Sequence, residues 1–254
     1  MIPQNRKFAS IVSGGIDSSL VSHYICQNSR PSYLIFLNHI GKDWHTKKIQ
    51  QFEKYLKNKI GIHNITESMY YKNYLKSIKI CNSPINSHSF VGNYINASIV
   101  KKKNCRAIFG GEGADELFGG YQTYLPKTLR DNPNITDYTK ISNTNLFNDT
   151  KEQYLFKKKM KTKRKESYSS YSFVSNKQER ETLSMMLMDA TVQMESNAFR
   201  GSDLMSMNNS VESRCLFYRK DIIKFALNLP LKYKINTRES KFMMTKNILK
   251  KLYL

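Results

Sequence analysis

The sequence predicts an α/β fold, a parallel twisted sheet with helices on both faces, followed by a helical C-terminal part. Short apolar runs, typical of buried strands, alternate with helix-like stretches from residue 8 to about residue 110. Glycine-rich turns directly follow the apolar runs at 8–12 and 107–109. From residue 178 onward the apolar residues recur at helical spacing, so we expect that part to be helical.

The individual elements follow from this alternation. We expect strands over 8–12, 33–37, 62–65 and 107–109, and helices over 18–27, 47–59, 69–79 and 88–102. The second of these helices is the most strongly patterned, because its apolar residues Ile49, Phe52, Tyr55 and Leu56 share one face. After residue 178, Leu183, Met186, Leu187, Ala190 and Met194 form a stripe that predicts core packing. The chain is thus divided into an α/β core over 1–124, a polar basic insertion over 125–180 and a helical part over 181–254.

Composition indicates an enzyme-sized chain of the cytoplasm. A chain of 254 residues that is 40% hydrophobic can bury a substantial core. Its four cysteines form no close pair, which argues against a disulfide framework and a zinc site. We find neither an N-terminal apolar signal region nor a run of about 18 apolar residues, so we expect no membrane association.

The charge balance is strongly basic, with 41 Lys and Arg against 20 Asp and Glu and a net charge of +21. Most lysines are dispersed in a chain that is also rich in Asn, Ile and Tyr. A compositional bias explains such dispersion better than a nucleic-acid surface, which should be local. We therefore do not expect nucleic acid as a partner. One run is local, over residues 157–165, and we expect it on a mobile loop or an exposed helix, with its role left open.

The motif Ser13-Gly14-Gly15-Ile16-Asp17-Ser18-Ser19 lies between the first predicted strand and the first predicted helix. Glycines let the backbone approach an anion closely, and hydroxyl groups and the amide groups of a helix N-terminus donate hydrogen bonds to it. The turn lacks the Lys of the common NTPase loop and carries Asp17 at its centre. A carboxylate beside a polyphosphate needs a bridging cation, and oxygen ligands suit Mg²⁺.

A second motif follows the strand expected at 107–109 and reads Gly110-Gly-Glu-Gly-Ala-Asp-Glu-Leu-Phe-Gly-Gly-Tyr121. Loops after neighbouring parallel strands meet at one edge of a sheet, so Asp115 can face Asp17 across one ligand. Glu112 lies in the glycine-rich turn, where its small neighbours are expected to leave its carboxylate exposed toward the ligand. Glu116 is expected only to cap the following helix.

Together, SGGIDSS and GGEGADELFGGY resemble the synthetase domain of the asparagine synthetase family. The first motif alone is shared with other adenylating enzymes that release pyrophosphate. The second motif is more specific and limits the resemblance to the asparagine synthetase family. A third segment, 203–217, resembles a further family motif, in which Glu212 and Arg214 correspond to a buried ion pair. The likeness covers most of residues 8–250 and is weakest between about 125 and 180.

The resemblance implies an adenine nucleotide alpha hydrolase-like core, with 1–124 as an ATP pyrophosphatase unit, and an ATP-dependent ligase that forms amides. Such a ligase converts a carboxylate, here aspartate, into an acyl-adenylate that ammonia attacks. The implied site has Ser13, Gly14, Gly15 and Ser18 around pyrophosphate, Asp17 and Asp115 on Mg²⁺, and Val12, Ile35, Gly110 and Gly111 along the ATP pocket. Glu112 and Asp115 are the implied catalytic residues, and the match at Glu112 favours aspartate.

Departures from the family pattern leave alternatives open. Met1 is followed by Ile2 rather than by a nucleophilic Cys, so we expect free ammonia, or ammonia from a separate glutaminase subunit, as the nitrogen source. The helix expected near 241–249 is followed by few residues, and Lys241 or Lys246 could replace a basic residue that the family brings to the pyrophosphate. The alternatives are a ligase that forms a different amide, as in β-lactam synthetase-like or peptide cyclase-like proteins, and a truncated nucleotide-binding subunit without turnover.

Overall fold

The structure is a computed structural model that describes residues 3, 6–39, 43–83, 85, 87–125, 150–236, 241, 244 and 245. The chain forms two compact units. The first unit consists of Met1–Glu112, Met194–Arg219 and Met244–Leu254, and the second of Gly113–Gln193 and Lys220–Met243. Each unit is therefore assembled from segments that are distant in the sequence.

The first unit is built on a parallel sheet, as the sequence predicts. Its strands in spatial order are β3 (Ile60–Ile65), β2 (Tyr33–His39), β1 (Phe8–Ile11), β4 (Ala107–Gly110) and β5 (Glu212–Cys215). All four neighbouring pairs are parallel, and β1 lies between β2 and β4. The carboxyl ends of β1 and β4 thus lie side by side, which is the arrangement that the two glycine-rich motifs require.

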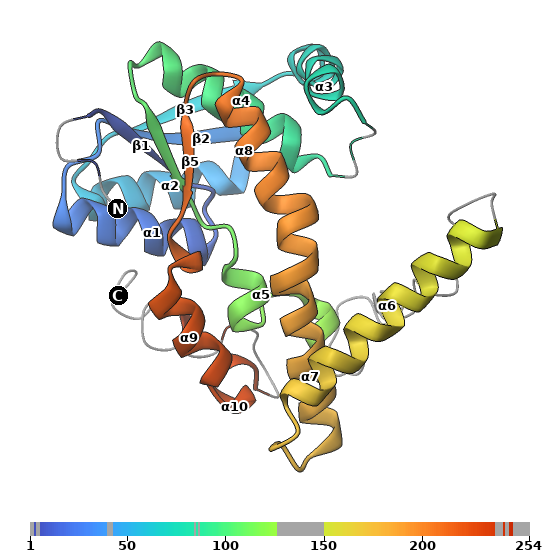
Figure 1. The fold of residues 1–254 in the computed structure, drawn as a ribbon. Coiled ribbons are helices and arrows are strands. Elements are labelled where there is room, and N and C mark those ends of the chain that lie inside the picture. The colour runs from blue at the N-terminus through green and yellow to red at the C-terminus, as the bar shows by residue number, and fades with distance from the viewer. Residues whose placement is uncertain are drawn as a thin grey trace. The chain divides into compact units, whose positions relative to one another are not determined.

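Helices cover both faces of this sheet (Figure 1). They are α1 (Ile16–Asn28), α2 (Asp43–Leu56), α3 (Glu67–Cys81), α4 (Ser89–Lys102) and α8 (Arg200–Met207). Because side chains alternate along a strand, β2 contributes Leu34 and Phe36 to a core cluster with α2, and Ile35 to a cluster with α4. Both clusters contain fully buried side chains, as expected for a parallel sheet between two helical layers.

The second unit is helical. Its elements are α5 (Ala114–Phe118), the 3₁₀ turn η1 (Gln122–Tyr124), α6 (Thr150–Ser170), α7 (Lys177–Met188), α9 (Lys220–Asn228) and α10 (Leu231–Lys234). Tyr124, Met185, Met186 and Ile235 form its buried cluster. Gly119 has a φ of +77°, and a Cβ there would lie 2.7 Å from Ile235, so this position requires glycine.

The structure confirms the predicted α/β fold, and the elements differ from the expected ones mainly at their ends. The expectation that the chain is helical from residue 178 onward is wrong at one point, because residues 212–215 form strand β5. A 3₁₀ turn, η5 (Leu216–Tyr218), follows that strand, and a π-helical stretch over Asp189–Phe199 lies between α7 and α8. The basic run lies on an exposed helix, α6, whereas residues 126–149 of the expected insertion lie outside the described residues.

Other expectations concern covalent links and membranes. Cys26, Cys81, Cys105 and Cys215 are free thiols in the structure. Among the described residues, no group of three or more His, Cys, Asp and Glu side chains is arranged to hold a metal ion. None of the helices in the described part of the chain is long and apolar enough to cross a bilayer.

Candidate active site

The turn after β1 is organised by the hydroxyl group of Ser18. This hydroxyl accepts a hydrogen bond from the amide of Ser13 at 2.9 Å and lies 2.8 Å from the Ser13 hydroxyl. It also donates to the carbonyl of Gly15 at 3.3 Å. Gly14 has a φ of +81°, a conformation that residues other than glycine rarely adopt. The sequence therefore fixes a tight turn before the first residue of α1.

The N-terminus of α1 has the properties of an anion site. Gly15 occupies the N-cap position, and no side chain of a described residue caps the helix there. The amide of Ser19 makes the first bond within the helix, to the carbonyl of Gly15, so the preceding amide groups point out of the helix end. Uncapped amide groups and the helix dipole both favour a negatively charged group, and a phosphate fits this donor set.

The second motif packs directly against this turn. A Cβ atom added at Gly111 would lie 2.8 Å from Cβ of Asp17 and 2.8 Å from the amide nitrogen of Ser18. Real side chains do not tolerate such distances, so the chain leaves β4 in backbone contact with the start of α1. The structure thus brings Gly110, Gly111 and Glu112 together with Asp17 and Ser18 at the carboxyl edge of the sheet.

Val12 and Ile35 lie at the same edge, where the amide of Val12 donates to the carbonyl of Ile35 at 2.8 Å. Both side chains are fully buried, Val12 in the cluster with α2 and Ile35 in the cluster with α4. Their packing role is therefore clear, whereas their contact with ATP stays a prediction.

The carboxylate of Glu112 is not exposed, and the expectation that its glycine neighbours leave it open is wrong. Its side chain folds back over Gly110, where a Cβ would overlap the carboxylate. The Oε2 atom is buried and has no hydrogen-bond partner among the described residues. Burial raises the pKa of this carboxyl group, although a backbone hydrogen bond opposes the shift. A buried acid with an unsatisfied oxygen next to a phosphate-type turn is typical of a functional group rather than of a stabilising one.

Asp115 belongs to the second unit, where the ammonium group of Lys241 lies 2.6 Å from its Oδ1 atom. The Lys241 side chain is 9% exposed. Gly120 makes room for the pair, since a Cβ there would overlap both side chains. The Lys241 ammonium group thus pairs with the Asp115 carboxylate, which we expected to bind Mg²⁺. The assignment of Asp17 and Asp115 to one metal ion stays a prediction.

Glu116 lies in the first turn of α5 and accepts a hydrogen bond from the Tyr121 hydroxyl at 2.5 Å. Burial is the main cause that raises its pKa to about 7, and the neighbouring carboxylates of Asp115 and Asp189 add to the shift. Tyr124 donates a similar bond to Asp189 at 2.6 Å. Sequence reasoning missed these partners, because nothing in the sequence relates residue 124 to residue 189.

The predicted pair in the third motif exists, but it is not buried. Arg214 donates two hydrogen bonds to Glu212, at 3.0 and 2.8 Å, and the Glu212 side chain is 57% exposed. These hydrogen bonds are the main cause of a lowered pKa at Glu212. The two residues lie on the same side of β5 because they are two positions apart.

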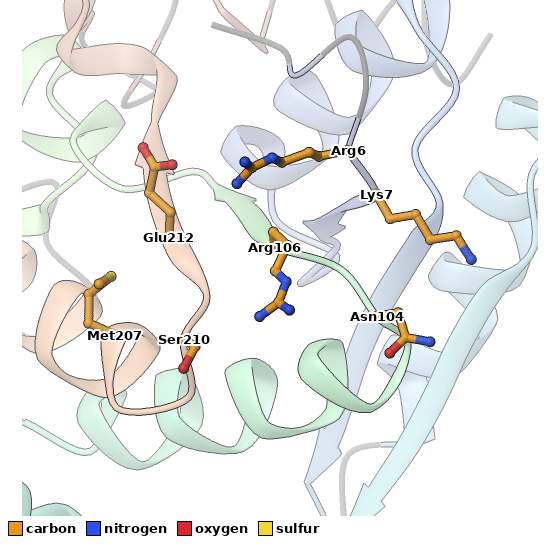
Figure 2. Close-up of a pocket in the computed structure, with 7 residues that line it drawn as sticks. All are labelled: Arg6, Lys7, Asn104, Arg106, Met207, Ser210 and Glu212. Carbon is orange, nitrogen blue, oxygen red and sulfur yellow. The ribbon is translucent and has the colours of Figure 1, made fainter.

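A basic hollow of about 600 Å³ lies at the opposite edge of the sheet (Figure 2). Its lining comes from the segments that enter β1, β4 and β5, namely Arg6, Lys7, Asn104, Arg106, Met207, Ser210 and Glu212. Ligands of open parallel sheets bind at the carboxyl ends of the strands, whereas this hollow lies at their amino ends. We therefore locate the candidate active site at the turn after β1.

Fold and site together define an α/β protein with a phosphate-type turn at the carboxyl edge of a parallel sheet. The profile of the family described as "Asparagine synthase" matches residues 3–253, so the chain belongs to the asparagine synthase family. It is 24% identical over 273 residues to the glutamine-hydrolysing asparagine synthetase 1 of Bacillus subtilis (strain 168). The match covers 93% of this chain and 43% of that relative, so the chain spans less than half of the relative's length.

The first prediction concerns the close approach at Gly111. Alanine at this position should displace the turn, because Ser18 meets it with a backbone nitrogen that cannot rotate away. Overpacking of this kind costs about 1–3 kcal/mol, and we expect ATP affinity to fall about tenfold or more. Titration calorimetry of the variant with ATP measures the effect.

Gly92→Ala is the matched control, because α4 leaves open space at that position. This change should raise the stability of the protein by up to about 1 kcal/mol without changing its ATP affinity. Equal ATP affinity in the two variants would contradict the proposed contact.

The second prediction concerns the buried carboxylate of Glu112. A carboxyl group with a raised folded-state pKa reduces stability as the pH rises from the ordinary value of 4.5 through the folded-state pKa. Glu112→Gln should therefore melt at a higher temperature than the parent protein at pH 8 and at nearly the same temperature at pH 4. Thermal denaturation across this range is the measurement. A variant that is less stable at pH 8 would mean that the carboxylate has a stabilising partner.

Proposed function

We propose that this chain is an ATP-dependent ligase that activates a carboxylate, aspartate, as an acyl-adenylate for attack by ammonia. The observation that carries the proposal is the packing of the Gly110-Gly111-Glu112 segment against Asp17 and Ser18. It joins a phosphate-type turn and a buried acid in one place, and the chain belongs to the asparagine synthase family. The aspartate and ammonia specificity rests on the likeness at Glu112 and is the finer part of the proposal.

In the first step an oxygen of the substrate carboxylate attacks the α-phosphorus of ATP. The bond between that phosphorus and the bridging oxygen breaks, and pyrophosphate leaves. We expect the turn residues Ser13, Gly14, Gly15 and Ser18 to hold the leaving group, because no side chain of a described residue caps the N-terminus of α1. Asp17 and Asp115 would hold Mg²⁺, which neutralises the charge of the polyphosphate when it is bound.

In the second step ammonia attacks the acyl carbon, the bond to the adenylate oxygen breaks, and AMP leaves with the bonding electrons. The attacking nitrogen must lose a proton. Glu112 suits this role, because its raised pKa makes the carboxylate a better proton acceptor than an exposed glutamate. Its position beside the turn after β1 puts it next to the phosphate-holding donors.

The third prediction is that ATP is cleaved between its α and β phosphates. The purified chain is incubated with ATP, MgCl₂, aspartate and ammonium chloride, and the products are separated by ion-exchange chromatography. AMP, pyrophosphate and asparagine should appear in equal amounts, and omission of aspartate should stop the reaction. Asp17→Ala should abolish it, whereas Glu67→Ala, a change of an exposed acid at the start of α3, should not. ADP and orthophosphate as the products would exclude the adenylation reaction.

The choice of amine and acid is tested in the same assay. Glutamine replaces ammonium, and other amino acids replace aspartate, one at a time. Pyrophosphate release with another carboxylate but not with aspartate would assign the chain to a ligase that forms a different amide. ATP binding without any turnover would assign it to a nucleotide-binding subunit.

The fourth prediction separates the role of Glu112 from a role in the fold. Glu112→Gln should bind ATP nearly as well as the parent chain, because the Glu112 carboxylate lies over Gly110 and is not one of the groups that we expect to hold the phosphates. Amide formation should fall by about 10²–10⁴-fold, the usual contribution of a general base. Binding is followed by calorimetry and turnover by AMP release. A fully active Gln variant would remove Glu112 from the mechanism.

A further inference from the structure

Helix α6 carries a concentration of positive charge that the ligase reaction does not use. Within Thr150–Ser170 it has eight Lys and Arg residues and two acidic residues, a net charge of +6, whereas the whole chain of 254 residues has +21. One of the two acids, Glu166, is paired with Lys163 at 2.9 Å. The charge of this helix is therefore local, unlike the dispersed lysines elsewhere.

The register of α6 aligns several of these charges on one face. Tyr154, Lys158, Lys161 and Lys165 follow one another at spacings of four, three and four residues, so they form one stripe along the helix. All four side chains are exposed, Tyr154 to 63%. The stripe extends about 16 Å along the helix axis, and successive members are about 4.5–6 Å apart along that axis. The buried positions, Gln153 and Ser167, lie on a different side of the helix, and α6 packs against α7.

A hollow of about 550 Å³ lies beside the stripe and is lined by residues of α6 and α7. Lys161, Arg164 and Lys165 line it from α6, and Met185 and Met188 line it from α7. Tyr168 also lines it, with its ring held by the guanidinium group of Arg180 at 3.9 Å from the ring centre. The lining of the hollow thus combines three cationic side chains and one acid, Glu181, with apolar and aromatic groups.

The partner that fits this surface is a flexible polyanion with planar apolar groups. An anionic membrane would need a free apolar face along the helix, but the apolar side chains of α6 that are well exposed, Tyr154 and Leu155, lie near one end of the helix. A single-stranded nucleic acid fits better, because its phosphates repeat along the stripe while an unstacked base can contact Tyr154 or enter the hollow. A duplex offers no unstacked base.

We propose that the stripe Tyr154, Lys158, Lys161 and Lys165 of α6 binds single-stranded nucleic acid. The proposal is independent of the ligase reaction, since none of these residues belongs to the candidate active site. It revises the expectation that nucleic acid is not a partner, because that expectation rested on the dispersed lysines and left the run at 157–165 open.

The test measures fluorescence anisotropy of a labelled 12-nucleotide oligouridylate with the full 254-residue chain, at salt concentrations from 0.05 to 0.3 M. Each phosphate contact contributes about 0.7 to the slope of log affinity against log salt concentration. The triple variant Lys158→Gln, Lys161→Gln and Lys165→Gln removes three such contacts, so its slope should be smaller by about 2. At 0.1 M salt its affinity should fall on the order of 100-fold. The triple replacement of the same lysines by Arg should keep the parent affinity, and Tyr154→Ala alone should weaken binding about fivefold or more.

The matched control removes three exposed lysines from another helix. Lys72, Lys76 and Lys79 lie on one face of α3, with spacings of four and three residues in the reverse order, and their change to Gln removes the same charge. This control should keep an affinity within about twofold of the parent chain. An equal loss in both triple variants would show that total charge, and not α6, determines binding. Tighter binding to an RNA duplex, or to phosphatidylserine vesicles while oligouridylate does not bind, would also overturn the proposal.

Discussion

The candidate site depends on the backbone contact between the end of β4 and the start of α1. Pairing of β1 with β4 brings the two strand ends together, and the absence of a side chain at Gly111 lets the loop after β4 reach the amide of Ser18. A methyl group at this position would separate the two motifs. The phosphate-type turn and the acid at 112 are therefore neighbours because of a glycine that performs no chemistry itself.

Two buried carboxyl groups, one in each unit, reduce the stability of the protein. Glu112 has a buried oxygen without a partner in the described part of the chain, and Glu116 has a pKa raised to about 7 despite its bond from Tyr121. Desolvation is the main cause at both positions. A fold selected for stability alone would replace such acids by apolar or amide groups. Their presence is consistent with a site that gives up stability for reactivity.

Local patterns were enough to predict the parallel sheet and its covering helices. A buried strand is visible as a short apolar run, and the apolar face of α2 is visible from the spacing of Ile49 and Phe52. The same holds for the turn at 13–19, where glycines and hydroxyls fix the backbone locally. Strand β5 could not be predicted in this way, because it has only four residues and its sequence Glu-Ser-Arg-Cys lacks an apolar run. Its strand conformation comes from pairing with β4, a distant partner. The bond between Tyr124 and Asp189 likewise depends on packing that no local window contains.

The late position of β5 in the sequence has a consequence for biosynthesis. Its residues follow β4 by about 100 positions, and a ribosome adds about 5–20 residues per second. For roughly 5–20 seconds, β4 is then an open edge with unpaired amide and carbonyl groups and the apolar sequence Ala-Ile-Phe-Gly. Open apolar edges are templates for pairing with other chains. The nascent chain is therefore expected to be most prone to aggregation in this interval, and a fragment that ends before residue 212 would keep that edge permanently.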